Sequence, residues 1–288
     1  MAYAKSYLGD QVASGVLIPT VQGISGVIPG VTVKPELSGL IGAEKVDFWY
    51  DIAPAVEDAD AGDDFDVAQV GSKKATIVMT RALHANEKIP QVAIDAINID
   101  IVGAKTLQLA TAIGNKLGSK FYTDLLALAQ AKTYTNGLSF IDAIAEGIAT
   151  FKAGSNTKLD GTNDTSFSNA TNGILPTTIV VGTTGEKLLR QDADFKALFD
   201  GQGQLPGTIG TLFGLQVVAS QHVTSIDFLL LNHQGVAYPY SLNMLRAVPS
   251  ELFNGIKLQA ELVYPDASEA SVLVINSFAM KFTEAAGA

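Results

Sequence analysis

Residues 99–132 read IDIVGAKTLQLATAIGNKLGSKFYTDLLALAQAK and contain no proline. Apolar residues recur in this run at steps of three and four, which places an apolar stripe on one face of a helix. The stripe consists of Ile101, Ala104, Leu109, Ala112, Ile113, Leu117, Phe121, Leu125 and Leu128. A helix over residues 100–132 would be roughly 45 Å long, and we expect it to act as a spine for the fold.

The spine does not have the composition of a membrane span. Lys105, Lys116, Lys120 and Asp124 interrupt it, whereas a span needs about 18 or more consecutive apolar residues. Its three glycines each cost about 1 kcal/mol in a helix, and such a cost is usually offset by close packing or a bend. We therefore expect a bent helix packed closely against other elements.

The composition favours an oligomer. Of the 288 residues, 47% are hydrophobic and only 17% are charged, which is typical of extensive buried or subunit-facing surface. A net charge of −10 disfavours a surface that grips nucleic acid, because phosphate binding needs clustered Lys and Arg. The chain has no cysteine, which excludes disulfides and thiolate sites, and its first residues lack an apolar signal core. We expect a protein made and kept in a cytoplasm.

Residues 1–44 are rich in Gly, Val and Pro, with prolines at positions 19, 29 and 35 that prevent a long helix. This segment has little means of building its own core, so it is either disordered or extended across another surface. We favour an extended arm that docks on neighbouring subunits.

Residues 46–52 and 74–80 alternate between apolar and polar side chains, which predicts two amphipathic strands. About twenty residues separate them, and loops of that length usually have a function. The loop carries Glu57, Asp58, Asp60, Asp63, Asp64 and Asp66. A calcium loop is disfavoured, because Gly62 and Asp63 occupy the wrong positions of the EF-hand pattern. Two interpretations of these acidic residues remain: a solvated acidic loop, or an acidic lobe that pairs with a basic patch on a neighbouring subunit.

Residues 81–97 are expected to form a helical prelude to the spine. His84 and Glu87 lie near each other there, but no second histidine stands at a metal-ligand spacing. A solvated or core-capping histidine is the expected role of His84.

The next segments predict a helix, a polar loop, a buried strand and a second helix. Residues 138–151 have a 3.6-residue apolar period, with Ser139 as N-cap and Asp142 in the first turn. Residues 154–173 are a surface loop or flexible hairpin. Residues 177–181 predict a buried strand, and the helix after it is expected to start with a capping box between Thr183 and Glu186. The glycine spacing before Lys187 does not match a nucleotide P-loop.

The rest of the chain predicts strands, at residues 210–220, 228–232, 236–240, 256–264 and 271–278. Residues 256–264 alternate as expected for a strand with one wet face. Residues 271–278 are apolar in their middle, which predicts a strand buried on both faces. The two long closing strands are expected to pack against the spine.

No catalytic set assembles from the sequence. The three histidines, His84, His222 and His233, stand in unrelated segments, and hydrolase or metalloprotease motifs are missing. His222 and His233 flank a predicted strand, and with Asp227 they are the one weak candidate site. We expect no enzyme activity, no cofactor and no metal.

The order of these elements resembles the major capsid protein of tailed phages, the Hong Kong 97-type fold. The strings that carry the likeness are RALHANEKIPQVAIDAINIDI from Arg81, SFIDAIAEGIATF from Ser139, PTTIVVGTTGEKLL from Pro176, IGTLFGLQVVASQHV from Ile209 and GIKLQAELVYP from Gly255. The likeness lies in layout and hydrophobic texture, not in an invariant signature. It implies an α+β fold and a structural role in a virion.

The resemblance also implies a domain plan. Residues 1–44 would be an extended N-arm and residues 45–80 an E-loop hairpin, both lying across adjacent subunits. Residues 81–132 and 241–288 would form a peripheral domain with the spine helix and closing strands, and residues 133–240 an α/β axial domain at capsomer centres. The candidate inter-subunit contacts are Trp49, Glu57, Asp58, Asp60, Asp63, Asp64, Asp66, Lys73 and Lys74.

The implied partners are further copies of the chain, as hexamers and pentamers of an icosahedral shell around double-stranded DNA that is not bound sequence-specifically. A portal is also implied, and assembly in the host cytoplasm. Some family members begin with a cleaved scaffolding segment that this sequence lacks, which implies a separate scaffolding protein or scaffold-free assembly. Others crosslink an E-loop lysine to an asparagine. Lys73 and Lys74 lie at the base of the returning strand and Asn276 lies in the last predicted strand, but no motif fixes those roles, and noncovalent interlocking is the default.

Two alternatives stay open. One is an encapsulin-like compartment shell, which has the same fold. The other is a soluble α/β enzyme or ligand-binding protein, which would be a monomer or small oligomer with a ligand pocket.

Overall fold

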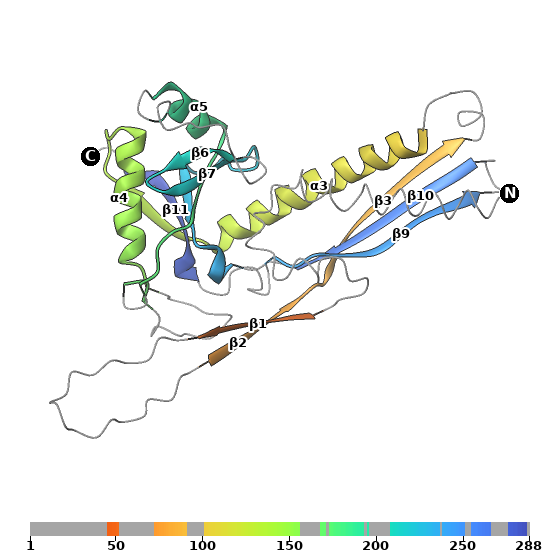
Figure 1. Ribbon diagram of the computed structural model, residues 1–288, viewed down its shortest axis with the longest axis horizontal. Coiled ribbons are helices and arrows are strands. Elements are labelled where there is room, and N and C mark those ends of the chain that lie inside the picture. The colour runs from red at the N-terminus through yellow and green to blue at the C-terminus, as the bar shows by residue number, and fades with distance from the viewer. Residues whose placement is uncertain are drawn as a thin grey trace, which may run out of the picture.

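The protein consists of two sheets joined by one long helix, with a separate two-stranded ribbon (Figure 1). The computed structural model describes residues 45–51, 72–90, 101–155, 168–170, 173–192, 195, 208–236, 238–250, 255–265 and 276–286. Within these ranges, no helix is both long and apolar enough to cross a membrane. The mixture of helices and strands confirms the α+β class.

The spine is helix α3, Ile101–Leu128, whose 28 residues span about 42 Å. It ends earlier than expected, because the chain enters strand β4 at Gln130. The predicted stripe is largely confirmed: Leu109, Ile113, Leu117, Phe121 and Leu125 are buried. Ala104 and Ala112 are exposed instead, and the buried face passes through Thr106, Ala110 and Tyr122. Two of the spine glycines, Gly114 and Gly118, lie on the buried side, as close packing requires.

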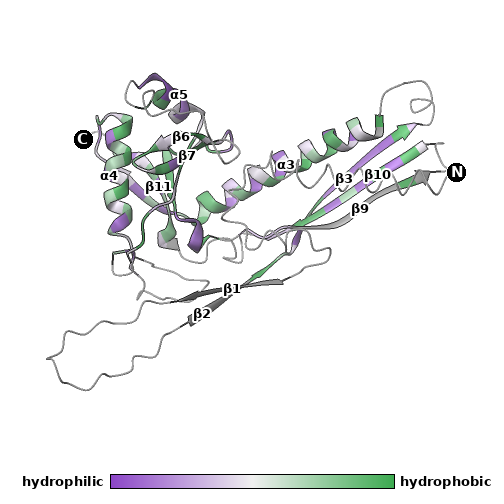
Figure 2. Cartoon of the chain, viewed as in Figure 1, coloured by the Kyte–Doolittle hydropathy of each residue, from purple (hydrophilic) through white to green (hydrophobic). Residues whose placement is uncertain are grey.

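A three-stranded antiparallel sheet runs along α3, in the order β3 (Arg81–Pro90), β10 (Gly255–Tyr264) and β9 (Ser241–Ser250). The helical prelude predicted for residues 81–90 is therefore wrong. These residues pair with β10 along its whole length, from Pro90 opposite Gly255 to Arg81 opposite Tyr264. Apolar and polar residues alternate along β3 and β10 (Figure 2). The apolar side of β10, with Leu258, Ala260 and Leu262, is buried, which confirms the strand with one wet face.

The six-stranded sheet lies at the other end of the molecule. Its strands, in spatial order, are β4 (Gln130–Tyr134), β11 (Ala279–Glu284), β8 (Phe228–Leu231), β5 (Thr178–Val181), β7 (Leu215–Ala219) and β6 (Thr208–Leu212). Helices α4 (Phe140–Lys152) and α5 (Thr183–Gln191) pack against this sheet. Strands β5 and β8 are buried throughout, which confirms the buried strand predicted at residues 177–181 and the strand predicted at residues 228–232.

The two faces of the six-stranded sheet belong to different cores. Val180, Leu229 and Leu231 pack in one cluster with α3 and the three-stranded sheet. The alternate residues of the same strands, such as Ile179 and Leu230, pack in a second cluster with α4 and α5. Because neighbouring residues of a strand face opposite sides, one short strand contributes to both cores. The spine thus shares a continuous apolar core with both sheets.

The end of the chain departs from the expected pattern. The strand predicted at residues 271–278 is wrong where the structure describes it, because Asn276–Phe278 is the short 3-10 helix η4 and the strand β11 starts at Ala279. This strand lies between β4 and β8 in the six-stranded sheet, whereas β9 and β10 lie with the spine. Residues 241–288 are therefore divided between the two sheets.

Two smaller predictions also fail. Residues 238–240 are not in a strand, since the chain after β8 turns through the short 3-10 helix η2, His233–Gly235. Residues 210–220 form two strands and not one, because Phe213 and Gly214 make a tight turn between β6 and β7. Both Phe213 (φ 52°) and Gly214 (φ 76°) have positive φ, the signature of a type I′ hairpin.

The helix starts test the predicted caps. Ser139 is the N-cap of α4 and accepts a hydrogen bond from the Asp142 backbone N–H, which confirms that prediction. The capping box at Thr183 is wrong: Gly182 is the N-cap of α5 and makes no side-chain hydrogen bond, while Glu186 pairs with Arg190. A Cβ on Gly182 would lie only 2.1 Å from the Val223 carbonyl oxygen, so the chain passes too closely for a capping side chain.

Asn169 anchors the described ends of the polar loop at residues 154–173. It is fully buried, and its Nδ2 donates to the carbonyl oxygens of Phe151 (2.8 Å) and Ser277 (3.0 Å). Its Oδ1 accepts from the Ser277 hydroxyl at 2.9 Å. One side chain therefore ties the end of α4 to the segment that enters β11.

Candidate functional site

The two strands predicted at the base of the long hairpin are confirmed. Strands β1 (Lys45–Asp51) and β2 (Ser72–Val78) are antiparallel, with Trp49 opposite Lys74 and Tyr50 opposite Lys73. In the described residues they pair only with each other, and β2 leads after two residues into β3 of the three-stranded sheet (Figure 1). An isolated two-stranded hairpin is marginally stable in water, so this ribbon is a natural element for docking on another surface.

The rest of the predicted contact set lies outside the described residues. This applies to Glu57, Asp58, Asp60, Asp63, Asp64 and Asp66, to the calcium-loop alternative and to the N-arm over residues 1–44. Of the predicted contact residues, the structure describes only Trp49, Lys73 and Lys74, whose backbones lie next to one another in the paired strands β1 and β2.

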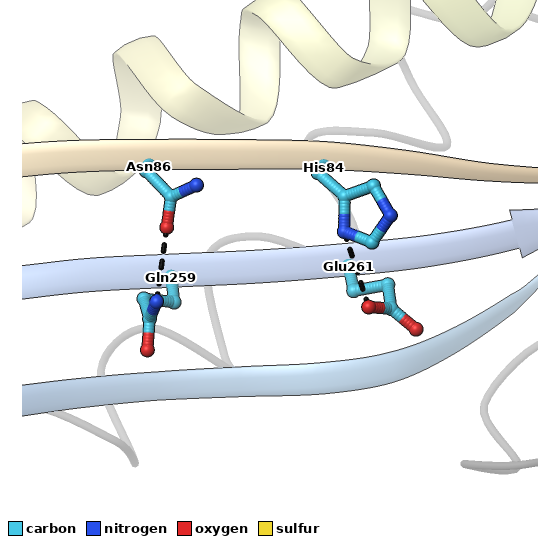
Figure 3. A network of polar contacts seen from close by, with 4 residues as sticks. All are labelled: His84, Asn86, Gln259 and Glu261. Carbon is cyan, nitrogen blue, oxygen red and sulfur yellow. Dashed lines mark hydrogen bonds and ion pairs between the residues drawn. The ribbon is translucent and has the colours of Figure 1, made fainter.

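A ladder of polar side chains joins β3 and β10 on one face of their sheet (Figure 3). His84 Nδ1 lies 3.1 Å from a carboxylate oxygen of Glu261, and Gln259 Nε2 donates to Asn86 Oδ1 at 3.1 Å. The next opposed pair in the register is Lys88 with Lys257. His84 is a solvated histidine, as expected, and Glu87 lies on the other face of the strand, where it pairs with Lys105 of α3 at 2.9 Å.

His222, Asp227 and His233 do not form a site. His222 stacks on Tyr122, with ring centroids 6.2 Å apart, and burial lowers the pKa of this histidine. His233 lies beyond the other end of β8, where its Nδ1 is 3.0 Å from the Thr177 hydroxyl. All of these contacts are structural.

Asp227 has a different set of partners. It accepts hydrogen bonds from the Tyr134 hydroxyl (3.1 Å) and from the Glu284 backbone N–H (2.9 Å). Burial, together with the nearby Asp227 carboxylate, raises the pKa of Tyr134 to about 12. Asp227, which directly precedes β8, thus links the start of that strand to the ends of β4 and β11.

Two hollows open beside the six-stranded sheet. The first, of about 380 Å³, lies at the start of α5 and is lined by exposed Leu138 and Leu188, by Phe140, and by the carboxylates of Asp227 and Glu284. Two carboxylates disfavour a phosphate there, in agreement with the rejected P-loop. The second, of about 300 Å³, is apolar and is lined by Ala145, Ile148, Lys152, Leu175, Pro176, Phe213 and Leu215.

The second hollow was missed by sequence reasoning. Its exposed apolar members are Leu175, which precedes the strand predicted at residues 177–181, and Phe213, which lies inside the strand predicted at residues 210–220. The available signal was the Phe-Gly pair between two apolar runs, since a two-residue turn with glycine second is a hairpin pattern.

Metal-ligating side chains do not converge in the described ranges: no group of three or more His, Asp or Glu residues there could hold an ion.

Comparison with known proteins identifies the family. The model of a family described as phage capsid protein matches residues 89–262, which is more than half of the chain. No sequence among the curated proteins matches.

Solved structures of phage particles share the fold. A Mycobacterium phage Che8 structure is 17% identical, with a TM-score of 0.54, and the match covers 83% of this chain and 84% of that one. The capsid of cyanophage P-SCSP1u is 10% identical, with a TM-score of 0.57 over 90% and 87%. The capsid of a native GTA particle is 14% identical, with a TM-score of 0.55 over 88% and 93%. The chain therefore belongs to the phage capsid protein family and has the Hong Kong 97-type fold.

Proposed function

We propose that this chain is the major capsid protein of a tailed phage, and that copies of it assemble into the hexamers and pentamers of an icosahedral shell around double-stranded DNA. The observation that carries this proposal is the family match over residues 89–262, which includes the spine helix, β9, most of β10, and every strand of the six-stranded sheet except β11. The role is structural, and the location is the virion capsid, assembled in the host cytoplasm.

The two sheets define the proposed domains. The six-stranded sheet with α4 and α5 is the axial domain, which gathers at capsomer centres, and α3 with β3, β9 and β10 is the peripheral domain. The expected boundary changes at the end of the chain, since β11 pairs with β4 and β8 and so belongs to the axial domain. Because α3 shares one core with both sheets, the two domains transmit load as one body.

The hairpin supports contact with a neighbouring copy. Its strands find no further strand partner among the described residues, and Trp49, Lys73 and Lys74 lie in its base. With the acidic residues between positions 57 and 66, these side chains are the proposed inter-subunit contacts. The interlock is noncovalent, held by apolar burial and opposite charge.

The net negative charge of the chain supports a role in a shell that must release its genome. The chain has 29 acidic and 19 basic residues, and the described polar ladder mixes both signs instead of forming a basic patch. Such a wall encloses DNA without sequence-specific binding. A scaffolding protein and a portal are the further proposed partners.

Assembly of the purified protein tests the proposal. The chain is expressed alone and together with the proposed scaffolding protein, and the products are examined by sedimentation velocity and negative-stain electron microscopy. Capsomers, tubes or closed shells are expected. A monomer under both conditions contradicts the proposal, and shells that carry an enzyme cargo in place of DNA favour the encapsulin-like alternative.

A further inference from the structure

Exposed apolar side chains gather at two separate places on the six-stranded block. Within the described part of the chain, the exposed large hydrophobic residues are Leu107, Leu138, Leu175, Leu188 and Phe213. Leu175 and Phe213 line the hollow beside the second half of α4, and this is named the Phe213 surface. Leu138 and Leu188 line the hollow at the start of α5, and this is named the Leu188 surface.

The two surfaces cannot form one continuous patch. Leu175 lies before strand β5 and Leu188 lies in the helix that follows it. Likewise Leu138 precedes α4, whereas Lys152, at the rim of the Phe213 surface, ends it; the helix between them spans about 20 Å. One chain therefore presents two different surfaces with exposed apolar side chains, a mainly apolar one at Phe213 and a mixed one at Leu188.

Phe213 is held outward by an unusual backbone. It is 53% exposed and occupies the first position of the type I′ turn, with φ at 52°. Asparagine, aspartate or glycine normally fills that position, because a bulky residue is disfavoured in the left-handed region. Strained residues of this kind cluster at functional sites. Folding alone would favour an asparagine at this position, so the phenylalanine needs a reason outside the isolated subunit.

The two surfaces complement each other. The hollow of the Leu188 surface measures about 380 Å³, and about 150 Å³ is enough to enclose a benzene ring. Lys152 lines the Phe213 surface, whereas Asp227 and Glu284 line the Leu188 surface, so the polar groups at the two rims have opposite charge. The hollow of the Leu188 surface has a mixed lining, in which exposed leucines lie beside threonines and two carboxylates. An aromatic anchor that packs on such leucines, with opposite charges nearby, is a common arrangement in protein contacts.

We infer that the Phe213 surface of one copy docks on the Leu188 surface of the next copy in the capsomer. This inference rests on the proposed function, because it takes a second copy as the occupant. Contact between two different surfaces is head-to-tail and forms a ring when the rotation between successive copies closes, whereas one surface that meets itself gives only a two-fold dimer. Pentamers and hexamers need the head-to-tail kind.

The variant Phe213→Asn is expected to weaken assembly without weakening the fold of the subunit. Asparagine before Gly214 is the preferred type I′ pair, so the unassembled variant should melt at the wild-type temperature or above it. Removal of the anchor should raise the critical concentration for assembly at least about tenfold, measured by sedimentation. The control is Leu107→Gln, which removes an equally exposed leucine from α3, outside both surfaces, and should leave that concentration unchanged. Unchanged assembly of Phe213→Asn, or an equal loss in the control, overturns the inference.

Disulfide trapping tests the pairing itself, since the chain contains no cysteine. The double variant Phe213→Cys/Leu188→Cys is assembled, oxidised and run on a non-reducing gel. A ladder that ends at five or six linked chains is expected, and none from Phe213→Cys/Leu107→Cys. Shells without a ladder, or dimers from Phe213→Cys alone, overturn the inference while the proposed function stands. Failure of the wild type to assemble overturns both.

Discussion

Replacement of Asn169 by alanine removes three buried hydrogen bonds at once. Its amide donates to the Phe151 and Ser277 carbonyls and accepts from the Ser277 hydroxyl, at 2.8–3.0 Å. Each such bond contributes about 1 kcal/mol net, and an unsatisfied buried partner costs more. The Phe151 carbonyl keeps a bond from the Gly154 N–H, so part of the loss is offset. We expect Asn169→Ala to lower the free energy of unfolding by about 3 kcal/mol.

Urea unfolding followed by circular dichroism measures this change, at a protein concentration below that of assembly. Ser277→Ala removes only the hydroxyl donor and should cost about 1–2 kcal/mol. Asn86→Ala is the matched control, because Asn86 makes an exposed bond to Gln259, and it should change stability by less than about 0.5 kcal/mol. The reasoning fails if Asn169→Ala costs no more than Asn86→Ala, or if it costs less than Ser277→Ala.

Three further predictions concern single contacts. Gly182→Ala places a methyl group against a backbone carbonyl that cannot move aside, and should cost about 2 kcal/mol or more in urea unfolding; a neutral result would show that α5 can shift freely. Glu87→Gln breaks the half-exposed ion pair with Lys105 and should cost at most about 1 kcal/mol, an effect that disappears in 1 M salt; a larger, salt-independent loss would contradict this. Burial keeps the folded-state pKa of His222 below its unfolded value of about 6.5, so the unfolded chain binds more protons below that pH and stability falls as the pH drops from 7 to 5. His222→Phe keeps a ring on Tyr122 and should flatten that slope, and an identical slope in both proteins would refute the assignment.

Sequence periodicity predicted the elements whose own pattern decides their structure. The three- and four-residue steps from Leu109 to Leu125 identified the buried face of α3, and the alternation in residues 256–264 identified β10 with its wet face. These patterns are reliable because each element buries one face along its whole length.

Predictions failed where pairing with a distant segment decides the outcome. Residues 81–90 contain Ala, Leu, Glu and Lys, which favour a helix, yet the two-residue alternation from Leu83 to Ile89 fits the pairing with β10, and that pairing wins. At α5 a capping box was expected from local residues, but the close approach of Gly182 to the Val223 carbonyl sets the helix start. The position of β11 between β4 and β8 could not be derived locally either.

The candidate contact residues were only partly accessible from sequence. A long hairpin with an acidic loop was visible in the pattern, and the structure confirms its paired base at Trp49, Lys73 and Lys74. The Phe213 and Leu188 surfaces were not visible, because exposure of an apolar residue depends on which neighbours the fold brings to it.

Electron cryo-microscopy of the assembled particles tests the central claim most directly. A reconstruction at a resolution that separates strands locates each sheet relative to the capsomer axis. We predict rings of five and six copies, with the six-stranded sheet and α5 near the axis and the three-stranded sheet with α3 at the rim. Rings with the three-stranded sheet at the axis, or particles without five- and six-fold rings, would contradict the account.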